Sequence, residues 1–461
     1  MIYNFDEVGA RAACLSVRNI LSCRTKKCFI YTFGCQQNEA DSEKIRAMAE
    51  MMGYSAAESA DDADLVVLNT CAIRAHAEMK ALSLLGSFKA RKKADPDFIL
   101  GVVGCMAAEE GVKESLKNKF HYVSFTLEPN MLHKMPEAIL RYLTDRKRSF
   151  VFGEDKGDIV EGVEPIRSYS HKAFVSVMYG CNNVCSYCIV PYVRGRERSR
   201  DSAEIIKECQ ALIDSGVREI TLLGQNVNSY KSDMDFPDLL SMIAKIEGDF
   251  IIRFMTSHPK DTSDKLIEVM AKYKGKIGAY FHLPLQSGSD TILKKMNRTY
   301  DSRRFLSIVE KLREKIPDIS LSTDVIVGFP GEGEQDFEDT LSVLSKARFD
   351  SVFAFMYSAR EGTPAARMEG QIPDEVKSDR LSRLFALQDP ISYENALPYL
   401  NKSVRVLTDS FDIRDGKRIY NGRTFSNKLV HFTAEEAALG EFVNVKINKA
   451  GGFDLIGAED K

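Results

Sequence analysis

The stretch GCNNVCSYCIVPYVRGRERSR spans residues 180–200 and carries three cysteines, Cys181, Cys185 and Cys188, with the spacing C-x3-C-x2-C. It follows an apolar run that predicts a strand at Ala173–Met178. Three thiolates on one short loop can hold three irons of a [4Fe–4S] cluster and leave the fourth iron open to a small molecule. A structural zinc site is the alternative, but it requires a fourth Cys or His, usually in a second C-x2-C pair, and none lies nearby.

Strand-like and helical runs alternate along the region from residue 171 to residue 397, which predicts one domain. The predicted strands are Ala173–Met178, Glu219–Leu223, Ile251–Thr256, Ala279–Leu283, Ser320–Val327 and Ser351–Tyr357. The predicted helices between them are Ala203–Ser215, Phe236–Ile246, Ser263–Tyr273, Ser302–Lys315 and Glu334–Lys346. This order favours a partial or complete parallel (β/α) barrel, in which reacting groups lie at the C-terminal ends of the strands.

Three further cysteines follow predicted strands in residues 26–150. Cys35 follows the run Cys28–Thr32, and the segments DLVVLNTC and FILGVVGC end at Cys71 and Cys105. In a doubly wound parallel sheet the C-terminal strand ends converge on one crevice, so these cysteines could meet and hold a second cluster with an open iron. Glycines precede two of them, at positions 34 and 104, and allow close backbone approach. Three unrelated buried cysteines are the alternative.

The ends of the chain and the connection between the two α/β regions have a different character. Residues 1–25 predict a weakly structured leader, and residues 151–170 predict a polar linker. Residues 398–461 contain short β-branched runs separated by Asp, Gly and Asn, which predict a small all-β barrel. The four remaining cysteines have no predicted chemical role: Cys14, Cys23, Cys28 and Cys209.

The composition is that of an ordinary globular protein, with 44% hydrophobic and 28% charged residues in 461 positions. Its net charge of −3 provides no global basic field, so any contact with nucleic acid must come from local patches. The sequence has no apolar run near the roughly 18 residues of a membrane helix and no signal-peptide pattern. We therefore expect a cytoplasmic protein whose clustered cysteines bind metal, with no membrane partner.

Three motifs resemble those of one family, the radical S-adenosylmethionine (SAM) methylthiotransferases. Residues 180–200 resemble the radical SAM core, and TFGCQQNEADSEK at residues 32–44 resembles the N-terminal cluster domain. NGRTFSNKLVHF at residues 421–432 resembles the TRAM domain, a small β-barrel that binds RNA. The resemblance covers the chain from Lys27 to its end. It implies an α/β fold with a doubly wound N-terminal domain, a radical SAM partial barrel and a C-terminal all-β barrel.

The family has branches that differ in substrate. One modifies N6-isopentenyladenosine at position 37 of tRNA, next to the anticodon; others modify threonylcarbamoyladenosine in tRNA or an aspartate of a ribosomal protein. Residues 33–39, FGCQQNE, resemble the first branch, although Gln37 stands where that branch usually has methionine. Asn182 and Asn183 stand where the other branches usually begin with aspartate. The resemblance therefore implies 2-methylthiolation of the isopentenylated adenine.

The resemblance also implies the cofactors. The cluster on Cys181, Cys185 and Cys188 would bind SAM and cleave it to a 5′-deoxyadenosyl radical. The auxiliary cluster on Cys35, Cys71 and Cys105 would carry the inserted sulfur, with two SAM molecules used per turnover. An electron donor and a sulfur donor are implied as partners. A C–H bond that is neither acidic nor electrophilic requires such radical chemistry, so no side chain is assigned as a catalytic acid or base.

Several side chains are candidates for binding SAM. Tyr187 lies between two cluster cysteines, where related enzymes stack an aromatic ring on the adenine of SAM. The other candidates follow or end predicted barrel strands: Gly224, Gln225, Asn226, Ser257, His258, Gln286 and Asp324. Their position at the reacting end of the barrel favours a role in binding. Each could instead be a packing, turn or capping residue.

Two basic runs are candidates for binding RNA. One contains Arg194, Arg196, Arg198 and Arg200, and the other contains Arg418, Arg423 and Lys428. Such runs are usually solvated surface. On a chain with a net negative charge, with one run inside a predicted RNA-binding barrel, they favour phosphate contacts. Tyr420 and Phe425 interleave the second run as possible stacking or core residues.

Three hypotheses follow. The first is a tRNA methylthiotransferase of the isopentenyl branch. The second is a sister enzyme, which activity on RNA lacking the isopentenyl group would favour. The third is a non-enzymatic iron–sulfur protein that binds RNA, whose clusters would not cleave SAM. Cluster sites with three cysteines argue against an electron carrier, because such proteins normally use four cysteines per cluster.

Overall fold

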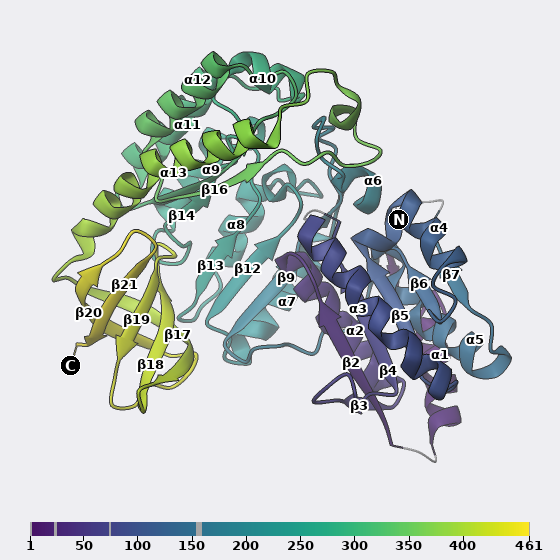
Figure 1. Ribbon diagram of the computed structural model, residues 1–461. Helices are drawn as coiled ribbons and strands as arrows, with labels where there is room; N and C mark the ends of the chain where they lie inside the picture. The colour runs from purple at the N-terminus through teal and green to yellow at the C-terminus, as the bar shows by residue number, and fades with distance from the viewer. Residues whose placement is uncertain (1, 23–24, 73–74, 154–158, 461) are drawn as a thin grey trace. The chain divides into compact units, whose positions relative to one another are not determined.

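The structure is a computed structural model that describes residues 2–22, 25–72, 75–153 and 159–460, with the backbone alone described for residues 75–77 (Figure 1). Its contacts divide the chain into two compact units. The first unit contains Met1–Ser168, Met178–Asn183 and Cys188–Arg200. The second contains Tyr169–Val177, Val184–Tyr187 and Asp201–Lys461.

The first unit is built on a parallel six-stranded sheet with the strand order β3-β2-β4-β5-β6-β7. The strands are β2 (Lys26–Thr32), β3 (Tyr54–Ala56), β4 (Leu65–Thr70), β5 (Ile99–Gly104), β6 (Phe125–Leu127) and β7 (Ser149–Val151). The helices are α1 (Ala10–Leu21), α2 (Gln36–Met51), α3 (Ala75–Ala94), α4 (Glu110–Asn118) and α5 (Met135–Asp145). The 3-10 turn η1 (Cys105–Ala108) precedes α4.

Both faces of this sheet are covered. In β4, Leu65 and Val67 pack in the core cluster that contains residues of α1, α2 and α5. The alternate residues Val66 and Leu68 pack in the cluster with residues of α3 and α4. Since successive strand residues point to opposite faces, the fully apolar run of β4 reflects burial on both sides. The predicted doubly wound fold is confirmed.

The prediction of a weakly structured leader at residues 1–25 is wrong. Strand β1 (Ile2–Asn4) pairs in parallel with β8 (Ile159–Glu161), and helix α1 follows it. Ala10, Cys14 and Val17 lie on one helical face and are buried in the core. The spacing of these small residues along one face of the helix gives α1 its place in the core. Cys23 lies outside the described residues.

The predicted linker at residues 151–170 is also more structured than expected. Besides β8, the backbone N–H of Ser168 donates to Glu43 at 2.8 Å, and Arg167 forms an ion pair with Glu43 at 3.1 Å. The Glu43 side chain is buried in α2, so these bonds fix the segment to the first unit. Residues 154–158 of this predicted linker lie outside the described residues.

The second unit contains two parallel three-stranded sheets, β13-β12-β9 and β14-β15-β16. The strands are β9 (Lys172–Ser176), β12 (Glu219–Leu223), β13 (Ile251–Phe254), β14 (Tyr280–His282), β15 (Ser320–Val327) and β16 (Ser351–Met356). A bridge between Ile252 and Ile277 links the two sheets, which gives six successive parallel strands in chain order. This is the predicted partial barrel, and each strand lies within two residues of its expected bounds.

Helices connect these strands on the outer side, and α11, α12 and α13 lie together beside β14 and β16 (Figure 1). The helices are α7 (Ser202–Asp214), α8 (Phe236–Ala244), α9 (Asp264–Lys272), α10 (Asp290–Lys295), α11 (Ser302–Lys315), α12 (Glu334–Ala347) and α13 (Asp374–Ala396). Side chains such as Asp201, Asp235 and Asp301 cap the helix starts by accepting backbone N–H groups. Helix α13 has Pro390 inside it and was not predicted.

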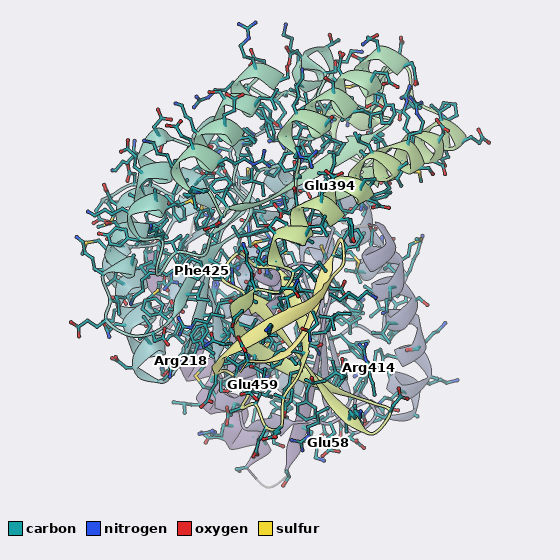
Figure 2. The ribbon with its side chains drawn as sticks, turned by 90° about the vertical axis from the view of Figure 1, so that its left-hand side faces the viewer. Glu58, Arg218, Glu394, Arg414, Phe425 and Glu459 are labelled. Atoms are coloured by element: carbon teal, nitrogen blue, oxygen red, sulfur yellow. The ribbon has the colours of Figure 1, made fainter. Side chains whose placement is uncertain are left out.

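The C-terminal part of the second unit is a closed barrel with the strand order β17-β18-β19-β21-β20. The strands are β17 (Ser403–Arg414), β18 (Lys417–Thr424), β19 (Leu429–Thr433), β20 (Phe442–Ala450) and β21 (Asp454–Glu459). Tyr420, Val430 and Phe432 fill its core. Figure 2 labels Arg414 at the far end of the β17–β18 hairpin and Phe425 at the other end of the barrel. The predicted small all-β barrel is confirmed.

Candidate cluster and cofactor sites

The first unit brings the three strand-end cysteines together. Cys35 is the N-cap of α2, Cys71 follows β4 and Cys105 begins η1. Because β2, β4 and β5 are neighbours in register, their C-terminal ends share one edge. Gly34, at φ 111°, lies against Cys71: a Cβ on this glycine would be 2.5 Å from the Cys71 Cβ. No other residue type fits there, so the glycine is required by the closeness of the two cysteine segments.

Asn38 ties the strand ends together and was not predicted as a site residue. Its side chain is fully buried, and its Nδ2 donates to the carbonyl oxygens of Phe33 and Thr70, each at 2.8 Å. Its Oδ1 accepts from Arg194 at 2.8 Å and faces the Cys35 sulfur at 3.7 Å. One amide therefore fixes the segments that carry Cys35 and Cys71. The sequence did contain a signal for Asn38, because this residue lies within the N-terminal motif at residues 32–44.

Arg194 lies in this site, and the prediction that it contacts RNA is wrong. Helix α6 (Val190–Arg194) ends at this residue, whose side chain is 4% exposed. Its Nε donates to the Cys105 sulfur at 3.1 Å, and its guanidinium pairs with Asp41 at 3.1 Å. Burial raises the pKa of the Cys105 thiol to about 12, while the positive charge of Arg194 acts in the opposite direction. A buried arginine with these partners is not available to a phosphate.

The donor set fits an iron–sulfur cluster better than a single ion. Gly34, before Cys35, lies against Cys71, and Gly104, before Cys105, lies against Thr70, so the three cysteine segments are close neighbours. Within the part of the chain that the structure describes, however, no three Cys, His, Asp or Glu side chains converge closely enough to bind one metal ion. A zinc ion needs sulfurs at about 2.3 Å from one point. In a [4Fe–4S] cluster each cysteine binds a different iron.

The other three cysteines lie on the loop between β10 (Met178–Tyr179) and α6. Cys185 is buried, whereas Cys181 and Cys188 are half-buried. In the first unit, the N–H of Cys181 donates to the carbonyl oxygen of Gly195 at 3.1 Å. In the second unit, the N–H of Ser186 donates to Met296 at 3.0 Å, and its hydroxyl donates to Lys295 at 2.8 Å. Backbone and side-chain bonds therefore shape this loop around its cysteines.

Tyr187 and the strand-end candidates for SAM binding all lie in the second unit. Tyr187 packs against Phe329, and its hydroxyl accepts from Arg298 at 2.8 Å. Gly224, Gln225 and Asn226 follow β12, and Ser257 and Gln286 come just after β13 and β14. Asp324 lies in β15. Apart from Asp324, which lies in the middle of its strand, the strand-end candidates lie beyond the C-terminal ends of their strands, as predicted.

Two of these candidates carry buried polar atoms without a partner. Ser257 is 4% exposed and Asn226 is 1% exposed. Among the described residues, nothing forms a hydrogen bond to Ser257 Oγ or to Asn226 Oδ1. A buried polar atom without a partner costs about 1–3 kcal/mol, so such atoms point to a ligand. The amino and carboxylate groups of SAM supply suitable partners.

The backbone is strained at the same strand ends. Thr256 has φ 65° and Gln286 has φ 68°, values that non-glycine residues rarely adopt. The Thr256 hydroxyl donates to the carbonyl oxygen of Gly224 at 2.6 Å, which links the ends of β12 and β13. The backbone of Gln286 bonds with Asp324 and Ile326 of β15. Such strained positions cluster at functional sites, and here both lie just beyond the C-terminal ends of barrel strands.

A polar network that sequence reasoning missed covers one face of β14 and β15. Tyr280 Oη lies 2.6 Å from Ser322 Oγ, which lies 2.8 Å from His282 Nδ1. His282 Nε2 lies 3.2 Å from Asp324 Oδ2. The residues of β15 on the other face, such as Leu321 and Val325, are fully buried. We call the set Tyr280, His282, Ser322, Asp324, Phe353 and Phe355 the inner face.

Two aromatic side chains of the inner face are exposed. Phe353 and Phe355 of β16 are 48% and 45% exposed. Phe353 pairs in register with Asp324, and its ring lies 6.1 Å from that of His282. Phe355 pairs with Ile326, which packs in the cluster that includes Tyr187. Exposed aromatic rings beside polar groups are typical of a site that receives a flat, partly apolar ligand.

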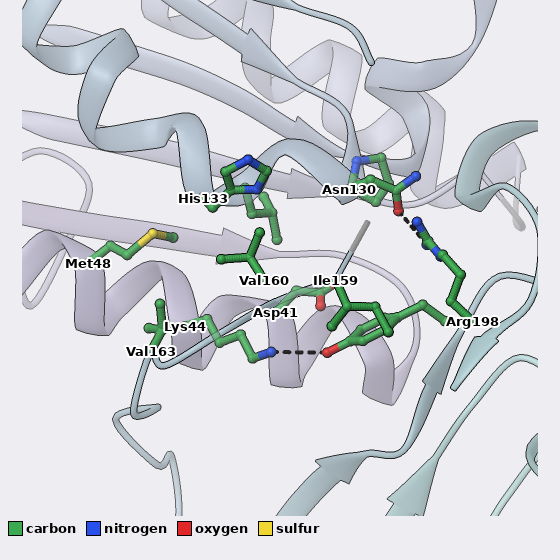
Figure 3. A pocket seen from close by; sticks show the side chains of 12 residues that line it. Asp41, Lys44, Met48, Asn130, His133, Ile159, Val160, Val163 and Arg198 are labelled. Carbon is green, nitrogen blue, oxygen red and sulfur yellow. Dashed lines mark hydrogen bonds between the residues drawn. The ribbon is translucent and has the colours of Figure 1, made fainter. Parts of the chain in front are cut away.

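The remaining arginines of residues 194–200 have different surroundings. Arg196 is exposed, whereas Arg200 is buried and paired with Glu161 at 2.5 Å. Arg198 is half-buried and donates to Asn130 at 2.9 Å beside a cavity of about 70 Å³ (Figure 3). In that cavity Lys44 donates to Tyr179 at 3.0 Å. Of this run, Arg196 alone is exposed.

The basic residues of the C-terminal barrel also differ in their exposure to solvent. Arg418 and Arg423 are exposed, and Arg418 lies over the ring of the exposed Phe411 at 5.1 Å. Lys428 is buried and forms an ion pair with Asp350 at 2.7 Å, so its predicted contact with RNA is wrong. Arg253 adds a second link, because it donates to the carbonyl oxygen of Thr424 at 2.8 Å. These bonds join the barrel to the strands of the second unit.

Comparisons with known proteins agree with this geometry. Residues 175–344 match the model of the radical SAM superfamily. Residues 27–128 match the uncharacterized protein family UPF0004, which covers the strand-end cysteines of the first unit. A solved structure of the radical SAM methyltransferase TsrM from Kitasatospora setae has the same fold, with a TM-score of 0.54, 12% identity and coverage of 74% of each chain. In the described part of the chain, no helix has the length and apolarity needed to span a membrane.

Curated relatives match over nearly the whole chain. The tRNA-2-methylthio-N(6)-dimethylallyladenosine synthase of Alkaliphilus oremlandii is 47% identical over 94% of this chain and 93% of its own length. The protein of the same name from Clostridium botulinum is 46% identical over 94% of this chain and 96% of its own length. With the cysteine sites, these matches define a radical SAM enzyme. The chain belongs to the family of tRNA-2-methylthio-N(6)-dimethylallyladenosine synthases.

Membership in this family has two consequences. The chain is a radical SAM methylthiotransferase, and its cofactors are SAM and [4Fe–4S] clusters. The non-enzymatic hypothesis is thereby set aside. The sister-enzyme hypothesis differs from the first hypothesis only in the substrate.

Proposed function

We propose that the chain attaches a methylthio group to C2 of N6-dimethylallyladenosine, also called N6-isopentenyladenosine, at position 37 of tRNA. The near full-length identity of 46–47% to relatives named for this product carries the proposal. That identity spans both sets of cysteines and the C-terminal barrel. The enzyme would act in the cytoplasm, with an electron donor and a sulfur donor as further partners.

The cysteines divide between two [4Fe–4S] clusters in this proposal. Cys181, Cys185 and Cys188 hold the cluster that binds SAM, and Cys35, Cys71 and Cys105 hold the auxiliary cluster. When bound, these groups supply a carbon radical from SAM and the sulfur to be inserted. The chain positions them: the three strand ends of the first unit fix one set of thiols, and a hydrogen-bonded loop fixes the other. Three ligands per cluster leave one iron of each open.

The second unit binds the organic part of SAM. Tyr187 presents its ring toward the adenine, while Ser257 Oγ and Asn226 Oδ1 provide buried polar atoms for the amino acid part. Asn226 Nδ2 is already held by Asp261 at 2.8 Å, so its Oδ1 has a fixed orientation. Asp324, held by His282, provides a carboxylate on the inner face. Fixed groups of this kind hold reacting atoms in position without reorganisation.

The inner face receives the modified adenine. Its exposed rings, Phe353 and Phe355, offer a stacking surface for a base and an apolar surface for a five-carbon chain. The bound base must leave the anticodon stack to reach this face, as it does in other enzymes that modify bases. The isopentenyl group would add apolar contact that an unmodified adenine lacks. This difference supports the substrate of the first hypothesis.

The C-terminal barrel binds the RNA backbone. Arg418 and Arg423 are its exposed predicted contacts, and Arg414 and Lys417 are exposed in the same hairpin. Exposed cations on a chain of net charge −3 create a local patch that binds phosphates and weakens with salt. Arg196 is the remaining candidate in the first unit.

A mass measurement of nucleosides tests the proposed substrate. The reconstituted enzyme is supplied with SAM, a strong reductant and anticodon stem-loop RNA that carries adenosine, isopentenyladenosine or threonylcarbamoyladenosine at position 37. A methylthio mass gain on the isopentenylated RNA alone is expected. A gain on the threonylcarbamoyl RNA, or SAM cleavage without a gain on any of the three RNAs, would move the substrate to a sister branch.

A further inference from the structure

Arg194 is a buried cation of the first unit, and it contacts the predicted cluster ligand Cys105. It lies six positions after Cys188, at the end of α6, yet its guanidinium reaches the strand-end cysteines. Nε donates to the Cys105 sulfur at 3.1 Å. One terminal nitrogen donates to Asn38 at 2.8 Å and to Asp41 at 3.1 Å.

The partners of this guanidinium are themselves fixed. Asp41 is 5% exposed and accepts a second hydrogen bond, from Gln37 at 3.1 Å. Asn38 is fully buried and bonded to two backbone carbonyls. Both lie in α2, directly after Cys35. The position of Arg194 relative to Cys105 is therefore determined from two sides.

The charges around Cys105 point to a function for this contact. The apolar side chains of Ala72, Ala108, Ile189 and Val193 pack in one cluster with Cys105. Burying an arginine is costly unless anions face it, and the single carboxylate of Asp41 also accepts from Gln37. A cysteine that binds iron does so as a thiolate, which supplies the second negative charge. The Nε–H of Arg194 donates a stronger hydrogen bond to a thiolate than to a neutral thiol, so the contact fits Cys105 as a metal ligand.

We propose that Arg194 is a positioning residue for the auxiliary cluster: its Nε–H orients the Cys105 sulfur and balances its charge while that sulfur binds iron. The proposal rests on the assignment of Cys105 as a cluster ligand. Hydrogen bonds to ligating sulfurs raise the reduction potential of iron–sulfur clusters, so Arg194 also sets the potential of this one. The segment that follows the SAM-binding cysteines thereby controls a property of the other cluster.

The test uses full-length protein in which Cys181, Cys185 and Cys188 are replaced by alanine, so that only the auxiliary cluster forms. Arg194→Met and Arg194→Lys are compared with Arg196→Met, an exposed arginine two positions away. Loss of iron to a chelator and the midpoint potential are measured, with circular dichroism as a check of folding. We expect Arg194→Met to bind the cluster on the order of 10-fold more weakly, a typical effect of losing a partner of a metal ligand, and at a lower potential.

The lysine variant separates positioning from general support of the fold. Arg194→Lys keeps the charge but lacks the Nε–H, so it should restore part of the cluster affinity and not the full potential. Arg196→Met should change neither quantity. A folded Arg194→Met protein with unchanged iron loss and potential would overturn the proposal. If Arg194→Met does not fold, an Arg194→Lys protein with the wild-type potential overturns it.

A separate variant distinguishes a wrong assignment of Cys105 as a cluster ligand from a wrong role for Arg194. If Cys105→Ala in the same background keeps its full cluster, the assignment of Cys105 fails, and the proposal for Arg194 fails with it. If Cys105→Ala loses the cluster and Arg194→Met does not change it, the assignment holds and the role of Arg194 alone is wrong.

Discussion

Lys428 Nζ lies 2.7 Å from Asp350 Oδ1, and both side chains are nearly buried. Lys428 directly precedes β19 of the C-terminal barrel, whereas Asp350 directly precedes β16. The other oxygen of Asp350 accepts the N–H of Leu321 at 2.8 Å, so the carboxylate is fixed. The ion pair joins the C-terminal barrel to the strands that carry the inner face. A residue that resembles a phosphate contact in sequence is thus a structural link.

Replacing Lys428 by methionine should destabilise the protein without removing its phosphate contacts. The change leaves Asp350 charged and buried, which costs about 3–5 kcal/mol. We expect a lower melting temperature and little change in the salt dependence of RNA binding. Arg418→Gln is the matched variant, because Arg418 is exposed: it should weaken RNA binding and leave the melting temperature unchanged. The reverse pattern would restore Lys428 as an RNA contact.

Phe355→Ala should lower kcat/KM for isopentenylated RNA. Loss of the apolar contact of a phenylalanine ring corresponds to roughly 1.5–3 kcal/mol, or about 10- to 150-fold. SAM binding in the absence of RNA should be unchanged. Phe453, a phenylalanine that is 65% exposed outside the inner face, provides the control variant Phe453→Ala. Equal activity of the two variants would contradict a role for Phe355 in binding the substrate.

Gly34→Ala should disrupt the auxiliary site. The added Cβ would lie 2.8 Å from the Cys71 sulfur, at a φ of 111° that alanine rarely adopts. We expect loss of the auxiliary iron, measured as iron per chain. Gly86→Ala is the control, since Gly86 lies in α3 and a Cβ added there would meet no atom within 4 Å. Full iron content in Gly34→Ala would contradict this prediction, because it would show that the strand ends accommodate the added Cβ.

The stability of the protein should fall below neutral pH because of His258. Burial lowers the pKa of this histidine to about 2, and the positive charge of Arg298 contributes. An unfolded histidine has a pKa of about 6.5, so below that pH the unfolded state binds a proton that the folded state excludes. The loss amounts to roughly 2 kcal/mol at pH 5. Asn at this position keeps an acceptor for the N–H of Lys260, so His258→Asn should flatten the decline in melting temperature between about pH 7.5 and pH 5. An equal decline in both proteins would contradict this origin.

Much of the fold could be predicted from the sequence because its strands are rich in apolar and β-branched residues or alternate between apolar and polar ones. β12 and β15 have the expected bounds: β12 is mostly apolar, and β15 alternates between residues such as Leu321 and Val325 and the polar side chains of the inner face. Helix α1 was missed because its buried face consists of small residues and a cysteine among arginines. Helix α13 has a weak apolar pattern and an internal proline, so its length depends on packing against other elements.

The residues of the candidate site that follow strands were predictable from the sequence. The residues that are buried by pairing with a side chain far away in the sequence were not. The cysteines and Ser257 follow strands, which a sequence shows directly. Arg194 resembled its exposed neighbour Arg196, and only its contact with Asp41, 153 positions away, explains its burial. The same holds for Lys428 and Asp350. A charge run is interpreted as surface until a partner from another part of the chain is known.

Iron analysis of cysteine variants tests the two-cluster arrangement most directly. The measurement is iron per chain, with Mössbauer spectra, after anaerobic reconstitution. Two [4Fe–4S] clusters correspond to about eight irons. One variant has alanine in place of Cys35, Cys71 and Cys105, and a second has alanine in place of Cys181, Cys185 and Cys188. Each variant should keep about four irons as one [4Fe–4S] cluster. Replacement of all six should leave none. A chain with unchanged iron after loss of either set would contradict the proposed arrangement.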